Sequence, residues 1–277
     1  MLVNQVVLIT GCSTGIGRAL AIEYVARGHR VFATARKPEV LADIVTGPNI
    51  VALTLDVNSA ESIAAAVEKV IAIAGRIDIL VNNAGYGQMG PVLDVTADQV
   101  RAQFETNIVG VIEMMKAVAP HMIAAKRGRI VNIGSISGIL TTPFAGIYCA
   151  SKAALHSISE ATRMELAPFG IEVVIVQPGG VKSQFGETAA GHVLTDPNSP
   201  YQRFAEGIAK RARASQQYSE SAESVAKEIV EATTREVAPY VLRAGHGGKL
   251  YPALKRWLPT RMLDRFLMKR FGLFDSR

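Results

Sequence analysis

The residues that could carry out chemistry in this sequence are concentrated between Ser135 and Lys152. Tyr148 and Lys152 are four residues apart in a helical pattern over 147–169, so their side chains share one face of that helix. A neighbouring ammonium favours the phenolate, and lowering the tyrosine pKa by about 3 units takes roughly 4 kcal/mol. Ser135 follows an apolar run, and its hydroxyl could bond a substrate oxygen. These residues predict an acid–base site, with an exposed Tyr–Lys pair as the alternative.

The start of the chain has the parts of a phosphate-binding turn. An apolar, β-branched run at 6–10 is followed by a glycine-rich turn and by a helical pattern from 16 to 27. Small residues in such a turn let backbone N–H groups approach a phosphate, and the helix N-terminus favours its negative charge. We expect phosphate contacts from Gly11, Ser13, Thr14, Gly15, Ile16 and Gly17. A tight turn without a ligand is the alternative.

Two cations follow the second predicted strand, 30–35. Dinucleotide-binding folds that hold the ribose hydroxyls of NAD carry an acidic residue at this point, and this sequence has none there. Arg36 and Lys37 instead suit the 2′-phosphate of NADP, which a guanidinium can bind through two hydrogen bonds. We therefore expect NADP(H) as the cofactor rather than NAD. A solvated turn is the alternative explanation of both cations.

The next two strands end in residues that could contact the rest of a dinucleotide. Asp56 and Val57 follow the strand at 50–55, where the carboxylate could accept from the adenine amino group and the valine could pack on the ring. An Asx turn would explain Asp56 equally well. After the strand at 77–81, small residues allow backbone close to a ligand, and asparagine amides could brace neighbouring strand ends. The contacts expected there are Asn83, Ala84 and Gly85.

A long helical pattern runs from 96 to 125, with Asn107 inside it. Asparagine is mildly unfavourable inside a helix because its side chain competes for backbone hydrogen bonds. Asn107 therefore either faces solvent, or opens the helix locally and holds a water molecule.

Strands and helices alternate along the chain, with further strands predicted at 129–134, 171–176 and 240–243. This pattern predicts an α/β protein, a doubly wound Rossmann fold with about seven parallel strands and helices on both faces. Residues 1–243 form one predicted dinucleotide-binding and catalytic domain. Within it, 181–217 is polar with little periodicity, which predicts a functional lid or a disordered loop.

The composition sets the class of protein. The chain has 277 residues, of which 49% are hydrophobic and 19% charged, as in a well-cored globular protein. The N-terminus lacks a secretory signal and no apolar run approaches the roughly 20 residues that span a bilayer, so we expect a cytoplasmic protein. Cys12 and Cys149 lie in unrelated contexts and the histidines show no ligand spacing, so we expect neither a disulfide nor a metal site.

The net charge of +6 resides in the C-terminal tail, 244–277, together with Arg243. Nine Lys or Arg face two Asp there, so the main body offers no evidence for nucleic-acid binding. Apolar residues at helical spacing, interrupted at Pro259, make this tail a basic amphipathic extension. Such a helix can lie on an anionic membrane, or it can dock on its own body, cover the substrate cleft or join subunits. We expect a homodimer or homotetramer.

Taken together, the motifs resemble those of the short-chain dehydrogenases/reductases over residues 4–243. They stand in the order and spacing of that family: Gly11-x-x-x-Gly15-x-Gly17, Asn82-Asn-Ala-Gly85, Asn107, Ser135, Tyr148-x-x-x-Lys152 and Pro178-Gly179.

The resemblance implies a role for each residue. Tyr148 would donate or accept the proton, and Lys152 would lower its pKa and bond the nicotinamide ribose. Ser135 would hold the substrate oxygen, and Asn107 would position a water in a proton relay. The basic residue Arg36 matches the NADP-preferring members of the family. Cofactor contacts are also expected from Pro178, Gly179 and Val181.

The expected reaction is reversible hydride transfer between NADP(H) and a carbonyl or secondary alcohol carbon of a small substrate. Ile136, Phe144, Phe185 and Val181 are apolar and close to the catalytic stretch or lid, which indicates a lipophilic substrate unless they are ordinary core. A non-catalytic NADP-binding sensor is one alternative, although it could dispense with catalytic side chains that are all present. A lyase or epimerase on the same scaffold is another, although such enzymes usually carry a larger C-terminal substrate domain.

Overall fold

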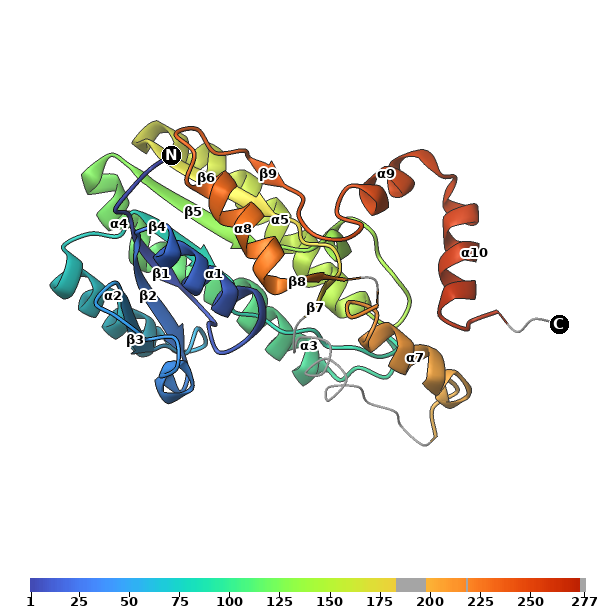
Figure 1. Cartoon of the computed structure of the whole chain (residues 1–277). Coiled ribbons are helices and arrows are strands. Elements are labelled where there is room, and N and C mark those ends of the chain that lie inside the picture. Colours follow the sequence, from blue (N-terminus) through green and yellow to red (C-terminus); the bar gives the residue numbers. More distant parts are fainter. Residues whose placement is uncertain (183–197, 218, 275–277) are drawn as a thin grey trace.

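The computed structural model describes residues 1–182, 198–217 and 219–274. Within these residues the main sheet has seven parallel strands, as predicted, and their order is β3-β2-β1-β4-β5-β6-β9 (Figure 1). The direction of progression reverses between β1 and β4, and the crevice at such a reversal is where open α/β sheets bind ligands. The strands are β1 (Val6–Ile9), β2 (Arg30–Ala35), β3 (Ile50–Thr54), β4 (Ile79–Asn82), β5 (Gly128–Ile133), β6 (Ile171–Val176) and β9 (Val241–Leu242).

Helices cover both faces of this sheet. Figure 1 shows α1 and α8 side by side against one face, and α2, α4 and α5 pack on the other. The bounds are α1 (Gly15–Ala26), α2 (Ala60–Ala74), α3 (Ala97–Phe104), α4 (Gly110–Ala125), α5 (Gly146–Leu166), α7 (Ala205–Ala212), α8 (Ala222–Thr233), α9 (Leu250–Trp257) and α10 (Thr260–Arg270).

The strands are apolar throughout because both of their faces are buried. Along β1, Val7 and Ile9 point into the core under α1 and α8, whereas Val6 and Leu8 point into the core under α2, α4 and α5. Successive side chains of a strand alternate between the two faces, so a strand between two helical layers needs apolar residues at every position.

The long helical pattern is interrupted at Asn107, where a π-helical turn, Glu105–Val109, joins α3 to α4. Of the two expectations for Asn107, local opening of the helix is confirmed. The combined helix, Ala97–Ala125, is also long and apolar enough to cross a membrane by length and composition, contrary to our expectation. In the fold, however, Met114, Val118 and Met122 on this helix are buried against the sheet. Burial in the core accounts for its apolar composition.

Part of the region that was predicted to be a loop is helical. Val181–Lys182 (β7) pairs with Glu220–Ser221 (β8) in a small parallel sheet, and α7 lies between them in the sequence. One apolar face of α7 is buried through Ile208 and Ala212. The helix is short and its other positions are polar or small, so the sequence shows no clear helical periodicity there. Phe185 and the rest of 183–197 lie outside the described residues.

The tail forms two helices, α9 and α10, separated by Pro259 as the sequence predicted. Leu263, Leu267 and Phe271 are buried in a cluster with Leu140 and Phe144 from the body of the protein. Figure 1 places α9 and α10 at the same end of the molecule as α7. The tail therefore docks on its own chain, which was one of the alternatives for this segment.

Candidate active site

A cleft of about 710 Å³ opens at the carboxyl ends of β1, β4, β5 and β6. Its wall contains nearly all of the residues that the sequence singled out. The exceptions are Gly17 and Asn107, which support the wall from behind, together with Lys37 and Phe144. Phe185 lies outside the described residues. The predicted residues that line the cleft are Gly11, Ser13, Thr14, Gly15, Ile16, Arg36, Asp56, Val57, Asn83, Ala84, Gly85, Ser135, Tyr148, Lys152, Pro178, Gly179 and Val181.

The glycine-rich turn between β1 and α1 is shaped so that only glycine fits at its key positions. Gly11 has φ +71° and Gly15 has φ +60°, a region that other residues rarely adopt. A Cβ on Gly17 would lie 2.3 Å from Asn83 Nδ2 and 2.4 Å from the carbonyl oxygen of Gly11. The turn thus exposes backbone and the N-terminus of α1 to the cleft, which is the arrangement that binds a pyrophosphate.

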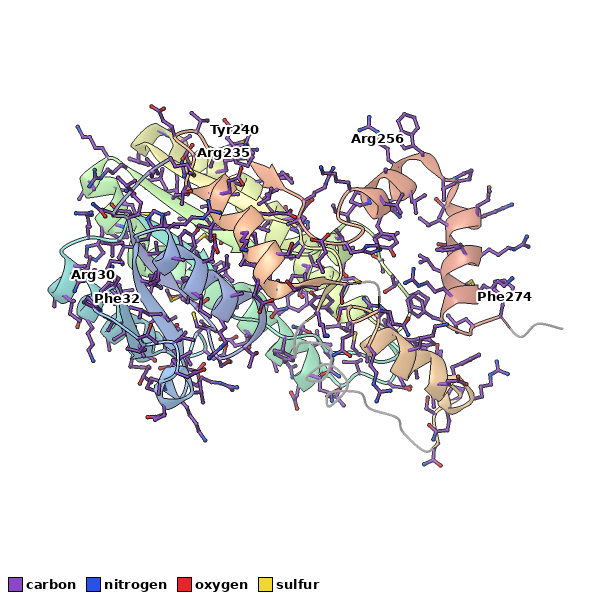
Figure 2. The ribbon with its side chains drawn as sticks, in the orientation of Figure 1. Arg30, Phe32, Arg235, Tyr240, Arg256 and Phe274 are labelled. Atoms are coloured by element: carbon purple, nitrogen blue, oxygen red, sulfur yellow. The ribbon has the colours of Figure 1, made fainter. Side chains whose placement is uncertain are left out.

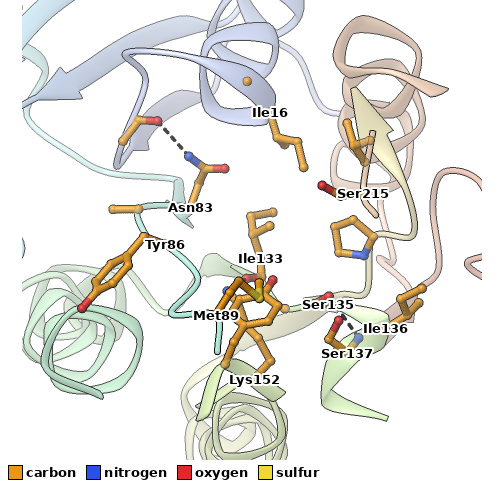
Figure 3. Close-up of a pocket in the computed structure, with 18 of the residues that line it drawn as sticks. Ile16, Asn83, Tyr86, Met89, Ile133, Ser135, Ile136, Ser137, Lys152 and Ser215 are labelled. Atoms are coloured by element: carbon orange, nitrogen blue, oxygen red, sulfur yellow. Dashed lines mark hydrogen bonds between the residues drawn. The ribbon is translucent and has the colours of Figure 1, made fainter. Parts of the chain in front are cut away.

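Asn83 braces this turn from the end of β4, as the sequence suggested. Its Nδ2 donates to the carbonyl oxygens of Thr10 and Gly11, both at 2.9 Å (Figure 3). In return, the Thr10 hydroxyl accepts hydrogen bonds from the N–H groups of Asn83 and Ala84, each at 3.0 Å. These contacts fix the two strand ends beside each other, so a ligand meets a preformed surface.

The far end of the cleft has the features expected for an adenosine site. Arg36 is exposed at the end of β2 and lines the cleft together with Asp56 and Val57. Asp56 also forms the Asx turn that was the alternative reading, because its Oδ1 accepts from the N–H of Asn58 at 3.0 Å. Lys37 is exposed but is not among the residues that line the cleft.

Ser135, Tyr148 and Lys152 meet at the opposite end. Tyr148 is buried and hydrogen-bonds with the Ser135 hydroxyl, which in turn accepts from the N–H of Ser137 at 3.0 Å (Figure 3). Contrary to the expectation of a lowered value, the pKa of Tyr148 is raised to about 12. Burial is the main cause because it removes water from the phenolate, while the Ser135 hydrogen bond and the charge of Arg211 act in the opposite direction.

Lys152 enters the cleft from α5, below Met89 and Ile133 in Figure 3. Its Nζ donates to the carbonyl oxygen of Ile133 at 2.8 Å, which directs the ammonium to the end of β5. Burial lowers the pKa of Lys152 to about 8, because a desolvated ammonium is costly. At neutral pH the side chain therefore remains mostly a cation at the end of β5.

Asn107 links α5, the helix that carries Tyr148 and Lys152, to the loop after β4. Its Oδ1 accepts from the N–H of Tyr86 at 3.2 Å, and its Nδ2 donates to Tyr86 O and to Ser151 Oγ, both at 3.1 Å. Asn107 lies within the π-helical turn Glu105–Val109, where the long helix departs from regular α-helical geometry. Asn107 thus positions the backbone of Tyr86 and Gly85, and the water relay implied by the resemblance stays a prediction.

His156 lies directly under Ser135 and is a supporting residue rather than part of the wall. The backbone N–H of Ser135 donates to His156 Nε2 at 3.4 Å. Burial, with a smaller contribution from the Lys152 charge, lowers the pKa of His156 to about 4. The imidazole is therefore neutral at pH 7 and able to accept this bond.

The substrate side agrees only in part with the sequence. Ile136 and Val181 line the cleft, whereas Phe144 packs in the apolar cluster behind it. The sequence reasoning missed residues from α7 and the tail, which have no motif and reach the cleft only through the tertiary fold. These are Arg211, Ala212, His246, Tyr251, Leu267, Arg270 and Phe271.

Comparison with known proteins agrees with this geometry. Residues 5–192 match the family model described as short chain dehydrogenase, which covers more than half of the chain. The chain belongs to the short-chain dehydrogenase family. It is therefore an oxidoreductase that acts on alcohol or carbonyl substrates.

Two relatives within this family match almost the whole chain. A 3-ketodihydrosphingosine reductase from Bacteroides thetaiotaomicron is 35% identical over 261 residues, which are 94% of this chain and 95% of that protein. The human 17-beta-hydroxysteroid dehydrogenase type 1 is 34% identical over 272 residues, or 92% of this chain and 79% of that one.

Solved structures of other short-chain dehydrogenases share the fold. One from Streptomyces avermitilis has a TM-score of 0.80 and 32% identity, covering 99% of this chain and 97% of its own. A Burkholderia phymatum member in complex with NAD has a TM-score of 0.79, 25% identity and 92% coverage of both chains. A serine dehydrogenase complexed with NADP+ has a TM-score of 0.76 and 27% identity, covering 87% and 94%. The cofactor of this chain is thus NAD or NADP.

Proposed function

We propose that this protein transfers a hydride reversibly between NADP(H) and the carbonyl or secondary alcohol carbon of a small lipophilic substrate. The observation that supports this most directly is the meeting of Ser135, Tyr148 and Lys152 at one end of a cleft whose other end is the glycine-rich turn. A sensor without catalysis would not need a phenol, a hydroxyl and an ammonium in contact with the same cleft.

The protein's own groups supply orientation and the proton. The bound nicotinamide supplies the hydride and accepts it in the reverse direction. Ser135 and Tyr148 hold the substrate oxygen, and the protonated Tyr148 phenol, with its pKa of about 12, is ready to donate to a carbonyl oxygen as negative charge develops there. Lys152 places a positive charge at the end of β5, where it favours the phenolate that results.

The preference for NADP over NAD rests on Arg36. This guanidinium lies at the end of β2, where the ribose of the adenosine half is expected, and it lines the cleft. Lys37 adds a second positive charge beside it on the surface. A 2′-phosphate gains charge-assisted hydrogen bonds from such a pair, whereas an unmodified ribose does not.

A lipophilic substrate is supported by the walls around the catalytic end. Leu140, Ile136, Met89, Leu267 and Phe271 contribute apolar surface there. The two relatives are named for a ketosphingoid base and for a hydroxysteroid, and both are lipophilic molecules. Apolar walls favour such molecules because burial of their surface removes it from water.

A substrate screen tests the proposal. Ketones, steroids and retinoids are incubated with the full-length protein, and the depletion of NADPH is measured, with NADH run in parallel. We expect turnover with at least one class and faster reaction with NADPH. Tyr148→Phe should retain NADPH binding but lose about 10²–10⁴-fold in turnover. Tyr240→Phe, at an exposed tyrosine, is the matched control. Normal turnover by Tyr148→Phe would refute the assignment.

We also propose that the protein is cytoplasmic, forms a homodimer or homotetramer, and contacts membranes peripherally through its tail. The support for membrane contact is that Trp257, Met262 and Phe266 are exposed on α9 and α10 among basic residues. Figure 2 shows Arg256 pointing away from the body of the molecule. Flotation with anionic liposomes tests the membrane contact, with a chain truncated after Arg243 as the comparison. Sedimentation of the full chain tests the oligomeric state. Absence of flotation would exclude the membrane contact.

A further inference from the structure

Arg211, near the end of α7, is a buried cation in the cleft wall that hydride transfer itself does not require. Its side chain is only 7% exposed. Among the described residues, its guanidinium hydrogen-bonds to two uncharged groups, the Thr142 hydroxyl and the Cys149 thiol. Across 1–182, 198–217 and 219–274, no carboxylate forms an ion pair with it. Buried charges are normally paired, so an anion bound in the cleft would stabilise the Arg211 guanidinium.

A second guanidinium lies close by. Arg270, at the end of α10, is partly buried, and its Nη1 donates to the Tyr251 hydroxyl at 3.2 Å. The aromatic ring of Phe271 lies 6.0 Å from Arg211 Cζ and 5.8 Å from Arg270 Cζ. In the part of the chain that the structure describes, Arg270 also has no acidic partner. The charge of Arg270 acts on the Arg211 guanidinium, and an anion bound to both would offset their repulsion.

Both cations belong to the substrate end of the cleft. Ala212, next to Arg211, packs with Tyr148 and Cys149, and the charge of Arg211 acts on the Tyr148 phenol. The surrounding wall is apolar, with Leu140, Leu267 and Phe271. A ligand of this region therefore needs an apolar body and an anionic group within reach of the reacting carbonyl.

We propose that the substrate carries a carboxylate, which Arg211 and Arg270 bind while its carbonyl lies at Tyr148. The inference rests on the proposed hydride-transfer function. A planar guanidinium matches a carboxylate with two parallel hydrogen bonds, and the bond is strong where water is excluded. The same cations repel an ammonium, so a long-chain amino ketone should be a poorer substrate than an oxo acid of similar length.

The experiment compares medium-chain oxo acids, in a series that varies the separation of ketone and carboxylate, with the methyl ester of each. The full chain is used with NADPH. We expect at least one acid to exceed its ester by roughly 10- to 100-fold in kcat/KM, which is the value of one or two charged hydrogen bonds. Arg211→Gln and Arg270→Met should raise KM for the acid more than for the ester. Arg213→Gln, at an exposed arginine two residues away, should keep the preference.

Two results would overturn the inference. One is equal efficiency for every acid and its ester in the unmodified protein. The other is an equal loss for acid and ester in Arg211→Gln, which would leave Arg211 with a structural role in holding Thr142. Binding measured without turnover separates this inference from the proposed function. If decanoate raises the Tm of the NADPH-loaded protein more than methyl decanoate does, the carboxylate site stands even if no ketone is reduced.

Discussion

The imidazole of His156 holds Ser135 in place, because His156 Nε2 accepts the Ser135 backbone N–H at 3.4 Å. Neighbouring glycines make room for this contact, since a Cβ on Gly134 would lie 2.4 Å from the same nitrogen. Only the neutral imidazole can accept, so the arrangement depends on burial and on the adjacent Lys152 charge, which together lower the pKa of His156 to about 4 from 6.5. The position of Ser135 thus depends on an imidazole that acid would protonate.

We predict that His156 makes the protein sensitive to acid. Between pH 6.5 and about 4 the unfolded chain binds a proton at this residue and the folded protein does not, so stability falls as the pH falls through that window. Near pH 5 the loss is about 2 kcal/mol. Urea unfolding at pH 7 and near pH 5 should show a smaller pH effect in His156→Gln than in the unmodified protein. His121→Gln, at an exposed histidine, is the control.

A second prediction concerns the cost of burying Lys152. Burial disfavours the ammonium and lowers its pKa from 10.5 to about 8, so the folded protein carries this penalty below about pH 8. Lys152→Met should therefore raise the free energy of unfolding of the dinucleotide-free protein at pH 7, by up to about 3 kcal/mol, while abolishing turnover. The gain should shrink as the pH rises from 8 towards 10.5. A variant less stable than the unmodified chain at pH 7 would contradict this account.

The glycine-rich turn leads to a third prediction. Gly17→Ala would place a methyl group 2.3 Å from Asn83 Nδ2 and so displace the brace between β1 and β4. We expect NADPH affinity to fall at least about 10-fold and stability to fall by about 1–3 kcal/mol, as for overpacked sites. Fluorescence titration and urea unfolding measure the two effects. Gly47→Ala has open space around the new methyl group and should change neither.

The fourth prediction tests cofactor choice. Arg36→Asp replaces the proposed 2′-phosphate ligand with the acidic residue that binds ribose hydroxyls in NAD-dependent folds. The ratio of kcat/KM for NADPH to that for NADH should fall by about 10-fold or more, because a charge-assisted pair is lost and a repulsion is added. Lys37→Asp makes the same change of charge at a residue that does not line the cleft, so it should have the smaller effect. An unchanged ratio in Arg36→Asp would show that Arg36 does not bind the 2′-phosphate.

Local patterns in the sequence were enough to define the dinucleotide half of the molecule. The strand predicted at 30–35 is β2, and α2 begins where the Ser59 hydroxyl accepts from the N–H of Ser62. These features depend on side-chain periodicity, capping and small residues at fixed spacing, which are properties of a few neighbouring residues. Nearly all of the residues that the motifs from Gly11 to Lys152 named likewise line the cleft.

The tertiary structure decided what depends on contacts between distant segments. Burial reverses the expected direction of the Tyr148 pKa, because desolvation is set by everything that packs around the phenol. Arg211 and Arg270 reach the cleft from α7 and α10, which follow Tyr148 in the sequence by many residues and carry no motif. The sequence by itself thus determined the fold and the chemistry of the site, because local patterns encode both. The charge and shape of the substrate end were fixed only by long-range packing.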